Sequence, residues 1–351
     1  MKKVERQSNI ELLRIFAMIG VIILHYISSP GHVLENVIEG GEKTYSIALV
    51  NSLCVCAVDL FVFISGFFMW KSTEVSMKKP IQLLLEVILL QELLAFVSVI
   101  HKGESFRHCL GALMPKNYFV TLYVALYLIS PLINKSLSSL TKEQYKYWLI
   151  VLIFLFSIEP ILIDALEGIK GADIMGASTI GILGSEWGYT IVTFLLIYVI
   201  GAYCGRFEIS WSKKKCVCIA LSTVLILTTW KIIEIRLGRS IGAEHYQNPV
   251  IILEAVAIFM LFSHIKIQSK IINQLSKTCF TVFLVHANFI NKMPIANLRQ
   301  LNAVALVANI LIKATIIFLL SALVGLVYST VEKKTFDKIE EKWDFYRLGI
   351  K

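Results

Sequence analysis

The chain has 351 residues, of which 56% are hydrophobic and 17% are charged, and its formal net charge is +9. About a quarter of the residues of a soluble domain are charged, so this composition argues against a soluble enzyme and indicates a protein that lies largely in lipid. The positive charge then calls for no nucleic-acid partner, because Lys and Arg collect on the cytoplasmic face of membrane proteins.

Apolar runs long enough to cross a bilayer recur along the whole chain. A spanning helix needs about 20 mostly apolar residues, and its backbone polar groups pair within the helix. The sequence therefore predicts an all-α integral membrane protein with a bundle of about ten transmembrane helices. The candidate spans are residues 11–29, 47–70, 81–100, 119–134, 147–166, 189–205, 216–233, 249–265, 275–291 and 304–329.

Lys and Arg are concentrated in alternate loops, beginning with the basic amino-terminal segment. This bias predicts a multi-pass protein of the cell membrane with both termini in the cytoplasm. We expect a transmembrane domain over residues 1–330 and a charged cytoplasmic tail over residues 331–351, which favours a short amphipathic helix on the inner membrane surface. The glycine-rich outer segment 167–188 is expected to form a re-entrant or lid segment.

The seven cysteines do not have the spacing of a metal site or a disulfide framework. Cys54 and Cys56 are separated by a single residue, as are Cys216 and Cys218, whereas metal and redox motifs use C-x-x-C. We interpret them as small buried apolar residues, and no metal site is predicted.

The first span, "RIFAMIGVIILH", is apolar except for Arg14 and His25 at its two ends. Eleven residues of an α-helix turn through three turns plus about 20° and rise about 16 Å. Both side chains therefore lie on nearly one face, with the cation near the cytoplasmic end and the imidazole deeper. This pattern suggests one side of a conduit. From spacing alone, headgroup contact by Arg14 and an interfacial position of His25 are equally good readings.

The second span, "CAVDLFVFISGFFMW", carries Asp59 in apolar surroundings and is interrupted by Ser65 and Gly66. A charged group in a bilayer is costly without a partner, and counting depth from the inner face puts Asp59 near the level of His25. We therefore predict that Asp59 pairs with His25. Ser65 and Gly66 alone fit a helix-packing notch better than a site.

His286 lies in the middle of the ninth span, "TCFTVFLVHANFI". In lipid, a functional imidazole and one satisfied by a neighbouring carbonyl are comparable interpretations. Weaker candidates in or near spans are Glu86, Glu92, Glu159, Lys231, Glu254 and Lys313.

Three of these motifs together resemble those of the acyltransferase-3 family of membrane acyltransferases. They are Arg-x10-His at Arg14 and His25, "VDLFVFISGF" around Asp59 and Ser65, and "VFLVH" ending at His286. The resemblance covers the chain to about residue 330. The inner loop after the second span, often arginine-rich in the family, offers only Lys78 and Lys79 here.

The resemblance implies O-acyl transfer, most often acetyl transfer, from cytosolic acetyl-CoA to a hydroxyl of a cell-surface or lipid-linked glycan outside the cytoplasm. It implies that Arg14, Lys78 and Lys79 bind the donor and that His25 is the general base. The expected catalytic set also includes Asp59 to orient His25, Ser65 or a backbone amide at the end of a span to stabilise the oxyanion, and His286. Some relatives carry a hydrolase-like carboxy-terminal domain, whereas here the chemistry is expected to belong to the membrane domain.

Alternative functions fit part of the same pattern. A small-molecule transporter of the same fold would also line its bundle with polar residues, and a polysaccharide flippase or polymerase component would handle glycans without acyl transfer. Acyl chemistry by the purified protein would separate the enzyme from both. Membrane lipid is the expected surrounding in every case, and the sequence does not indicate an oligomeric state.

Overall fold

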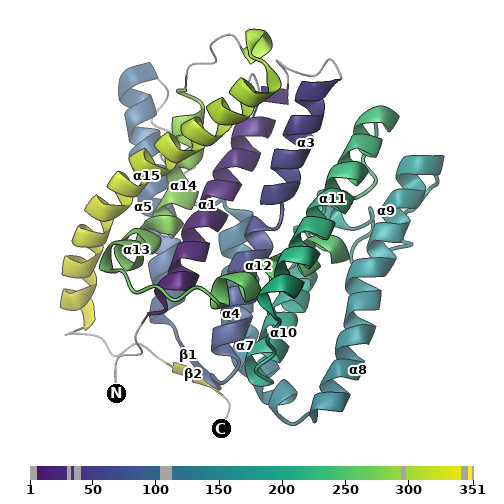
Figure 1. Ribbon diagram of the computed structural model, residues 1–351. Coiled ribbons are helices and arrows are strands. Elements are labelled where there is room, and N and C mark those ends of the chain that lie inside the picture. Colours follow the sequence, from purple (N-terminus) through teal and green to yellow (C-terminus); the bar gives the residue numbers. More distant parts are fainter. Residues whose placement is uncertain are drawn as a thin grey trace. The chain divides into compact units, whose positions relative to one another are not determined.

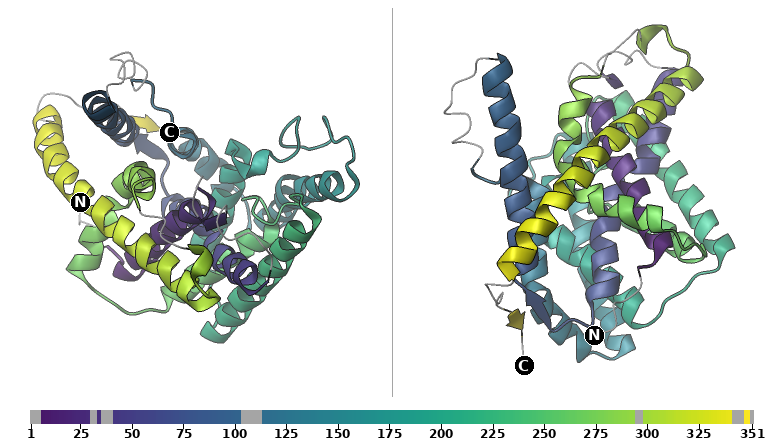
Figure 2. Two further views of the ribbon diagram at one scale, coloured as in Figure 1. Left: turned by 90° about the horizontal axis from the view of Figure 1, so that it is seen from above. Right: turned by 90° about the vertical axis from the view of Figure 1, so that its left-hand side faces the viewer.

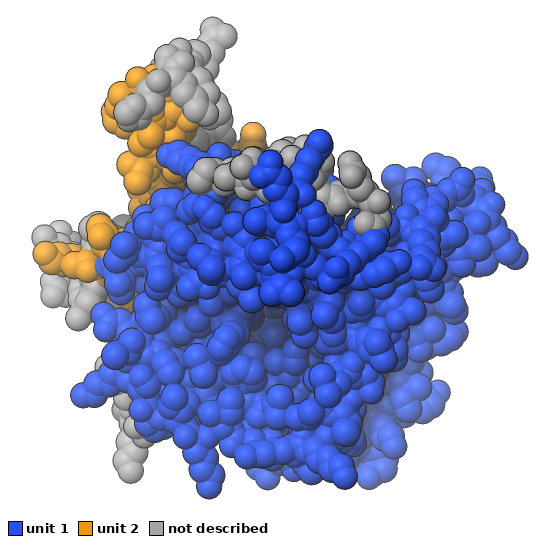
Figure 3. All heavy atoms as spheres, turned by 45° about the horizontal axis from the view of Figure 1, so that its top comes forward, with its two compact units in different colours: residues 1–68, 141–326 blue, residues 69–140, 327–351 orange. Residues whose placement is uncertain are grey.

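The computed structural model describes residues 6–29, 33–34, 41–102, 113–293, 298–340 and 347–349. Its contacts divide the chain into two compact units, which Figure 3 shows in different colours. Unit 1 comprises residues 1–68 and 141–326, and unit 2 comprises residues 69–140 and 327–351.

Unit 1 is a bundle of helices. In chain order these are α1 (Ser8–Ser28), α3 (Glu42–Cys54), α4 (Ala57–Met69), α8 (Lys142–Ile153), α9 (Glu159–Lys170), α10 (Ile191–Arg206), α11 (Lys213–Leu237), α12 (Pro249–Ser263), α13 (Lys270–Leu275), α14 (Cys279–Ile290) and α15 (Ala303–Glu340). A π-helical turn, η1 (Phe154–Ile158), joins α8 to α9, and there are 3-10 turns at η2 (Glu186–Gly188), η3 (Ser276–Thr278) and η4 (Leu298–Gln300). The last residue of α4 and the end of α15 belong to unit 2.

Polar caps mark where several of these helices begin. The side chains of Thr141, Thr190, Ser212, Asn248 and Ser269 each accept a hydrogen bond from a backbone N–H of the first turn of their helix. These N–H groups have no partner within a helix, so each cap fixes a start that apolar composition alone leaves open.

Helix α1 lies inside unit 1, with α3, α12, α13 and α14 packed around it (Figures 1 and 2). Two thirds of its most apolar stretch is buried within the protein, at 67%. The ionisable residues of the first span therefore face other helices to a large extent, and the site is built around this element.

Within the described part of the chain, seven helical stretches are long and apolar enough to cross a membrane. They are Ser8–Ser28, Glu42–Met69, Lys78–Ile100, Tyr118–Ser138, Lys142–Lys170, Lys213–Leu237 and Ala303–Thr330. The three other predicted spans fall on the shorter helices α10, α12 and α14. A helical, multi-pass membrane protein is thus confirmed, whereas the count of ten crossings and the cytoplasmic termini stay predictions.

The second predicted span is divided into two helices. Helix α3 ends at Cys54 and α4 begins at Ala57, with Asp59 in its first turn. Helix α1 crosses at this junction, where a Cβ added to Gly20 would lie 3.3 Å from the Cβ of Ala57. Asp59 therefore lies in the first turn of a buried helix.

Helices α4 and α10 approach each other closely through two glycines. A Cβ on Gly66 would lie 2.1 Å from the carbonyl oxygen of Tyr198, and one on Gly201 would lie 2.4 Å from that of Phe63. Small residues permit such approach between membrane helices. The packing interpretation of Gly66 in "VDLFVFISGF" therefore has a direct structural basis.

We expect Gly66→Ala to destabilise the protein by about 1–3 kcal/mol or more, because the obstructing atoms belong to backbone and cannot rotate away. Thermal unfolding of the detergent-solubilised protein measures this loss. Gly20→Ala is the matched control, since its closest neighbour at 3.3 Å is a side-chain carbon that needs to move only slightly. Equal melting temperatures for the two variants would contradict the close α4–α10 contact.

Unit 2 contains β1 (Glu74–Ser76), α5 (Lys78–Lys102), α7 (Tyr118–Ser138), the end of α15 and β2 (Arg347–Gly349). The two strands pair antiparallel, and Arg347 Nη1 lies 2.8 Å from Glu74 Oε1. Residues 331–340 of the charged tail are helical and continue α15, and β2 follows at Arg347–Gly349; a position of this tail on the inner membrane surface stays a prediction.

Candidate functional site

Two histidines from distant parts of the chain meet inside unit 1. His25 Nδ1 on α1 lies 2.6 Å from His286 Nε2 on α14, and the two ring planes are nearly parallel, with an angle of 11° between them and their centroids 4.9 Å apart. His286 is buried, with 3% of its surface exposed. The structure thus brings together two of the four residues expected to be catalytic.

The contact of Nδ1 of His286 determines which nitrogens of the two imidazole rings are protonated. His286 Nδ1 is 3.1 Å from the carbonyl oxygen of Val282, which can only accept a hydrogen bond. Nδ1 of His286 therefore carries the proton, and its Nε2 accepts one from Nδ1 of His25 when both rings are neutral. His25 Nε2 is then left without a proton, which is the state that a general base requires.

Helices α1 and α14 run in the same direction along the face that carries Arg14 and His25. Cys279 at the beginning of α14 lies 3.8 Å from the carbonyl oxygen of Arg14, and His286 further along meets His25. Helix α1 is continuous over both positions. The continuous helix thus keeps the eleven-residue spacing of Arg14 and His25, whereas a shared face for their two side chains stays a prediction.

Arg14 has an ion-pair partner that sequence reasoning missed. Its Nη1 lies 2.7 Å from Glu11 Oε1, while Arg6 lies 3.7 Å from the same oxygen. Glu11 is buried, and about a third of the Arg14 side chain is exposed, at 32%. The guanidinium thus balances a buried carboxylate and retains donors that face outward.

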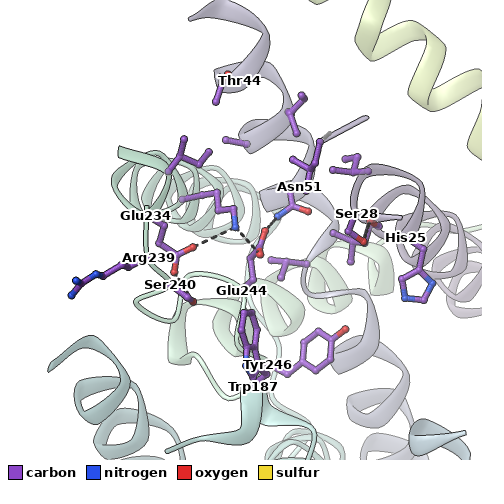
Figure 4. Close-up of a pocket in the computed structure, with 18 of the residues that line it drawn as sticks. His25, Ser28, Thr44, Asn51, Trp187, Glu234, Arg239, Ser240, Glu244 and Tyr246 are labelled. Atoms are coloured by element: carbon purple, nitrogen blue, oxygen red, sulfur yellow. Dashed lines mark hydrogen bonds and ion pairs between the residues drawn. The ribbon is translucent and has the colours of Figure 1, made fainter. Parts of the chain in front are cut away.

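A cavity of about 580 Å³ opens beside His25. Its walls come from α1, α3, α11 and the loops that precede α10 and α12. Figure 4 shows His25 on one side and Glu234, Arg239 and Ser240 on the opposite side. Arg14 does not line this cavity, so a continuous conduit from Arg14 to His25 stays a prediction.

The wall opposite His25 is held by a network of charges. Lys231 Nζ lies 2.7 Å from Glu244 Oε2 and 3.4 Å from Glu234 Oε2. Asn51 Nδ2 donates to Glu244 Oε1 (Figure 4). Lys231 was a weak candidate in the sequence, and the structure gives it a defined place between two carboxylates.

Aromatic side chains form a further part of the lining. Trp187, Tyr189 and Tyr246 line the cavity, and the rings of the two tyrosines lie 5.1 Å apart. Burial raises the pKa of Tyr189, which lies in the loop before α10. Its hydroxyl therefore stays protonated at neutral pH, and Tyr189 forms a side-chain hydrogen bond with Tyr246.

The expected pairing of Asp59 with His25 is wrong. His25 Nδ1 faces His286, and neither carboxylate oxygen of Asp59 has a hydrogen-bond partner within the described part of the chain. Asp59 is fully buried and interacts electrostatically with Glu254 on α12, a second buried carboxylate. Asp59 was expected near His25 because the two have similar depths, but depth does not determine which way a side chain faces. A catalytic role for Asp59 stays a prediction.

The remaining predicted site residues lie elsewhere. The hydroxyl of Ser65 donates to the carbonyl of Phe61 in its own helix, at 3.0 Å. Lys79 Nζ lies 3.2 Å from the hydroxyl of Tyr123, and Lys78 precedes it at the start of α5. Both lysines belong to unit 2. Their role in donor binding, and that of Ser65 at an oxyanion, stay predictions.

Several residues of the site went unnoticed in the sequence; most lie near helix ends or in loops, whereas Asp164 lies in the middle of α9. They are Glu11, Asn51, Asp164, Glu234, Glu244 and His245. Glu244 and His245 belong to the polar run "GAEHYQN" directly before α12, and polar residues are ordinary in a loop between helices. Among the described residues, no group of three or more His, Cys, Asp or Glu has the arrangement to hold a metal ion.

The fold and this site define a multi-pass membrane protein with a histidine pair beside a polar cavity. A family model described as an acyltransferase domain matches residues 7–331, nearly the whole chain. The chain therefore belongs to the acyltransferase-3 family and is a membrane acyltransferase. No curated protein and no solved structure gives a significant match.

Proposed function

We propose that the protein transfers an acetyl group from cytosolic acetyl-CoA to a hydroxyl of a glycan outside the cytoplasm, with His25 as general base. The observation that carries this proposal is the His25–His286 contact at 2.6 Å, together with the 3.1 Å contact from His286 to Val282. Their hydrogen bonding leaves Nε2 of His25 proton-free beside a cavity. His286 is the positioning residue in this scheme.

The reaction follows from that protonation state. The acceptor hydroxyl gives its proton to His25 Nε2 while its oxygen attacks the thioester carbonyl. A carbon–oxygen bond forms and the carbon–sulfur bond breaks, after which the departing thiolate takes the proton from His25. His25 ends as it began, and no further reactant is needed.

The lining of the cavity supports an acceptor rich in hydroxyl groups. Two cations, Lys231 and Arg239, and two carboxylates, Glu234 and Glu244, line it, so its formal charge is balanced. Aromatic rings beside paired polar groups suit the apolar faces and hydroxyl edges of a sugar. A strongly anionic acceptor would need an excess of positive charge at this wall.

Reconstituted proteoliposomes test the proposed function. With labelled acetyl-CoA outside and a glycan acceptor on the opposite side, we expect label in ester linkage on the glycan and release of free CoA. Movement of acceptor or acetyl-CoA across the bilayer without any ester product would instead favour a transporter. Analysis of surface glycans from cells with and without the protein identifies the acceptor.

Arg14 is proposed to contact the phosphates or the polar arm of the donor, with Lys78 and Lys79 as further donor-binding residues. We expect Arg14→Ala to weaken acetyl-CoA binding by about tenfold, the loss of one charge-assisted contact, with a smaller effect on turnover. Measured Kd values for acetyl-CoA check this.

Two variants separate donor binding by Arg14 from its pairing with Glu11. Arg14→Lys retains the cation and should recover most of the affinity. In Arg14→Ala, the buried carboxylate of Glu11 loses its closest partner. The double variant Glu11→Gln with Arg14→Ala removes that carboxylate as well. An unchanged Kd in Arg14→Ala would leave the guanidinium with a structural role only.

A further inference from the structure

A second ordered set of polar side chains reaches the cavity wall opposite His25. Asp164 Oδ2 lies 2.8 Å from His245 Nδ1, and His245 Nε2 lies 3.3 Å from Ser240 Oγ. A carboxylate accepts hydrogen bonds, so Nδ1 of His245 carries the proton and Nε2 is the acceptor. Carboxylate, imidazole and hydroxyl in this order are the arrangement that activates a serine nucleophile.

Only the hydroxyl of this set is open to solvent, as a nucleophile requires. Asp164 and His245 are buried, whereas Ser240 is exposed and lines the cavity (Figure 4). The ring of Trp187 lies over the imidazole of His245, with the centroids 4.7 Å apart. The imidazole is thus shielded while the hydroxyl that it contacts remains open to a substrate.

The loop before α10 is shaped to hold Asp164. The backbone N–H of Ser185 donates to Asp164 Oδ1 at 3.1 Å. Gly184 has a φ of +88°, and a Cβ there would lie 2.5 Å from the same oxygen. One carboxylate oxygen is therefore fixed by the loop and the other by His245, which sets the orientation of the imidazole.

The surroundings of Ser240 supply a second acceptor and a cation. Its hydroxyl lies 3.3 Å from Glu234 Oε1 as well as from His245 Nε2. Lys231 Nζ is 3.4 Å from the other oxygen of Glu234. Lys231 thus partly neutralises the carboxylate that lies beside Ser240, and it is itself paired with Glu244 at 2.7 Å.

We propose that Ser240 is the nucleophile of a second acyl-handling centre, which acts on small carboxylic esters that enter the cavity. Ser240 Oγ attacks the ester carbonyl and its proton passes to His245 Nε2. The Oγ–carbon bond forms, the ester carbon–oxygen bond breaks, and the leaving alcohol takes the proton. Water then hydrolyses the acyl-serine, and the products are the carboxylic acid and free Ser240. This activity is independent of acyl transfer at His25.

A fluorophosphonate probe tests the nucleophile in the purified full-length protein. Attack by Ser240 forms an Oγ–phosphorus bond and releases fluoride, so the protein gains the mass of the adduct. We expect the adduct on the peptide that contains Ser240. Ser240→Ala should lower the labelling rate by at least about 100-fold, as loss of a catalytic serine does.

Ser185→Ala is the matched control, because Ser185 Oγ contacts the same imidazole at Nδ1, 3.0 Å away, rather than at Nε2. This variant should label within about twofold of the wild type, since the serine nucleophile is retained. His25→Asn should also label normally, which separates this proposal from the proposed function. Hydrolysis of p-nitrophenyl acetate is expected to follow the same order among the variants.

Three results would overturn the proposal. One is an adduct that persists at the wild-type rate in Ser240→Ala, and a second is an equal loss in Ser185→Ala and Ser240→Ala. The third is a folded wild-type protein that neither labels nor hydrolyses the ester. Each of these results would mean that Asp164, His245 and Ser240 serve only to pack the loops before α10 and α12 against α9.

Discussion

Replacing His25 with asparagine is expected to lower the turnover number for acyl transfer by about 10²–10⁴-fold, the usual contribution of a general base. The amide nitrogen of asparagine occupies the position of Nδ1, so it can still donate to His286 Nε2. Nothing occupies the position of Nε2, the nitrogen that takes the proton. The variant therefore removes the base while it keeps the contact to α14. Initial rates of ester formation in proteoliposomes measure the loss.

Two controls separate chemistry from folding in this experiment. Acetyl-CoA binding should be unchanged in His25→Asn, because the proposed donor contacts lie elsewhere. Ser28→Ala alters the same cavity one helical turn away, where the hydroxyl donates to the carbonyl of Leu24. It should retain turnover within about threefold, as substitutions that leave the reacting groups in place do. A folded His25→Asn protein with wild-type turnover would remove the base assignment.

Hydropathy was sufficient to locate the helices, because lipid requires every crossing segment to be apolar and to satisfy its own backbone. It did not indicate the break between α3 and α4. Val55 and Cys56 at that junction are as apolar as the rest of the span, so the composition does not indicate a break there. The break lies against Gly20 of α1, a contact between helices that the local composition does not record.

Ionisable residues inside apolar runs pointed to two side chains that the structure brings together. Arg14, His25 and His286 were all identified in this way, and the last two are in contact although 261 residues separate them. The partner of His25 was not predictable, because depth along a helix says nothing about the direction in which a neighbouring side chain points. Asp59 has a suitable depth and faces α12 instead.

The cavity wall opposite His25 was largely missed for a related reason. Glu244 and His245 lie in a loop, and polar residues are ordinary in loops. Their significance comes from burial and from contacts with Asn51 and Asp164, which belong to other helices. Sequence alone finds a site residue when its type conflicts with its local surroundings, and these residues show no such conflict.

His286 is expected to act by fixing the proton of His25 rather than by touching a substrate. His286→Leu suits the buried position but offers no acceptor, so Nδ1 of His25 loses the partner that sets its protonation state. We expect turnover to fall by about 100-fold, since loss of an orienting partner with a change of tautomer is costly. The Kd for acetyl-CoA should not change.

His286→Gln distinguishes this role from simple packing. The side-chain oxygen of glutamine reaches the position of Nε2 and accepts from Nδ1 of His25, so turnover should recover by about tenfold over His286→Leu, the worth of one restored hydrogen bond. A residue that only fills space would show the opposite order, because leucine suits an apolar helix contact better than glutamine. Equal turnover for the two variants, with both folded, would mean that the proton on His25 is placed by some other group. The comparison thus tests the contact on which the proposed reaction depends without removing the base itself.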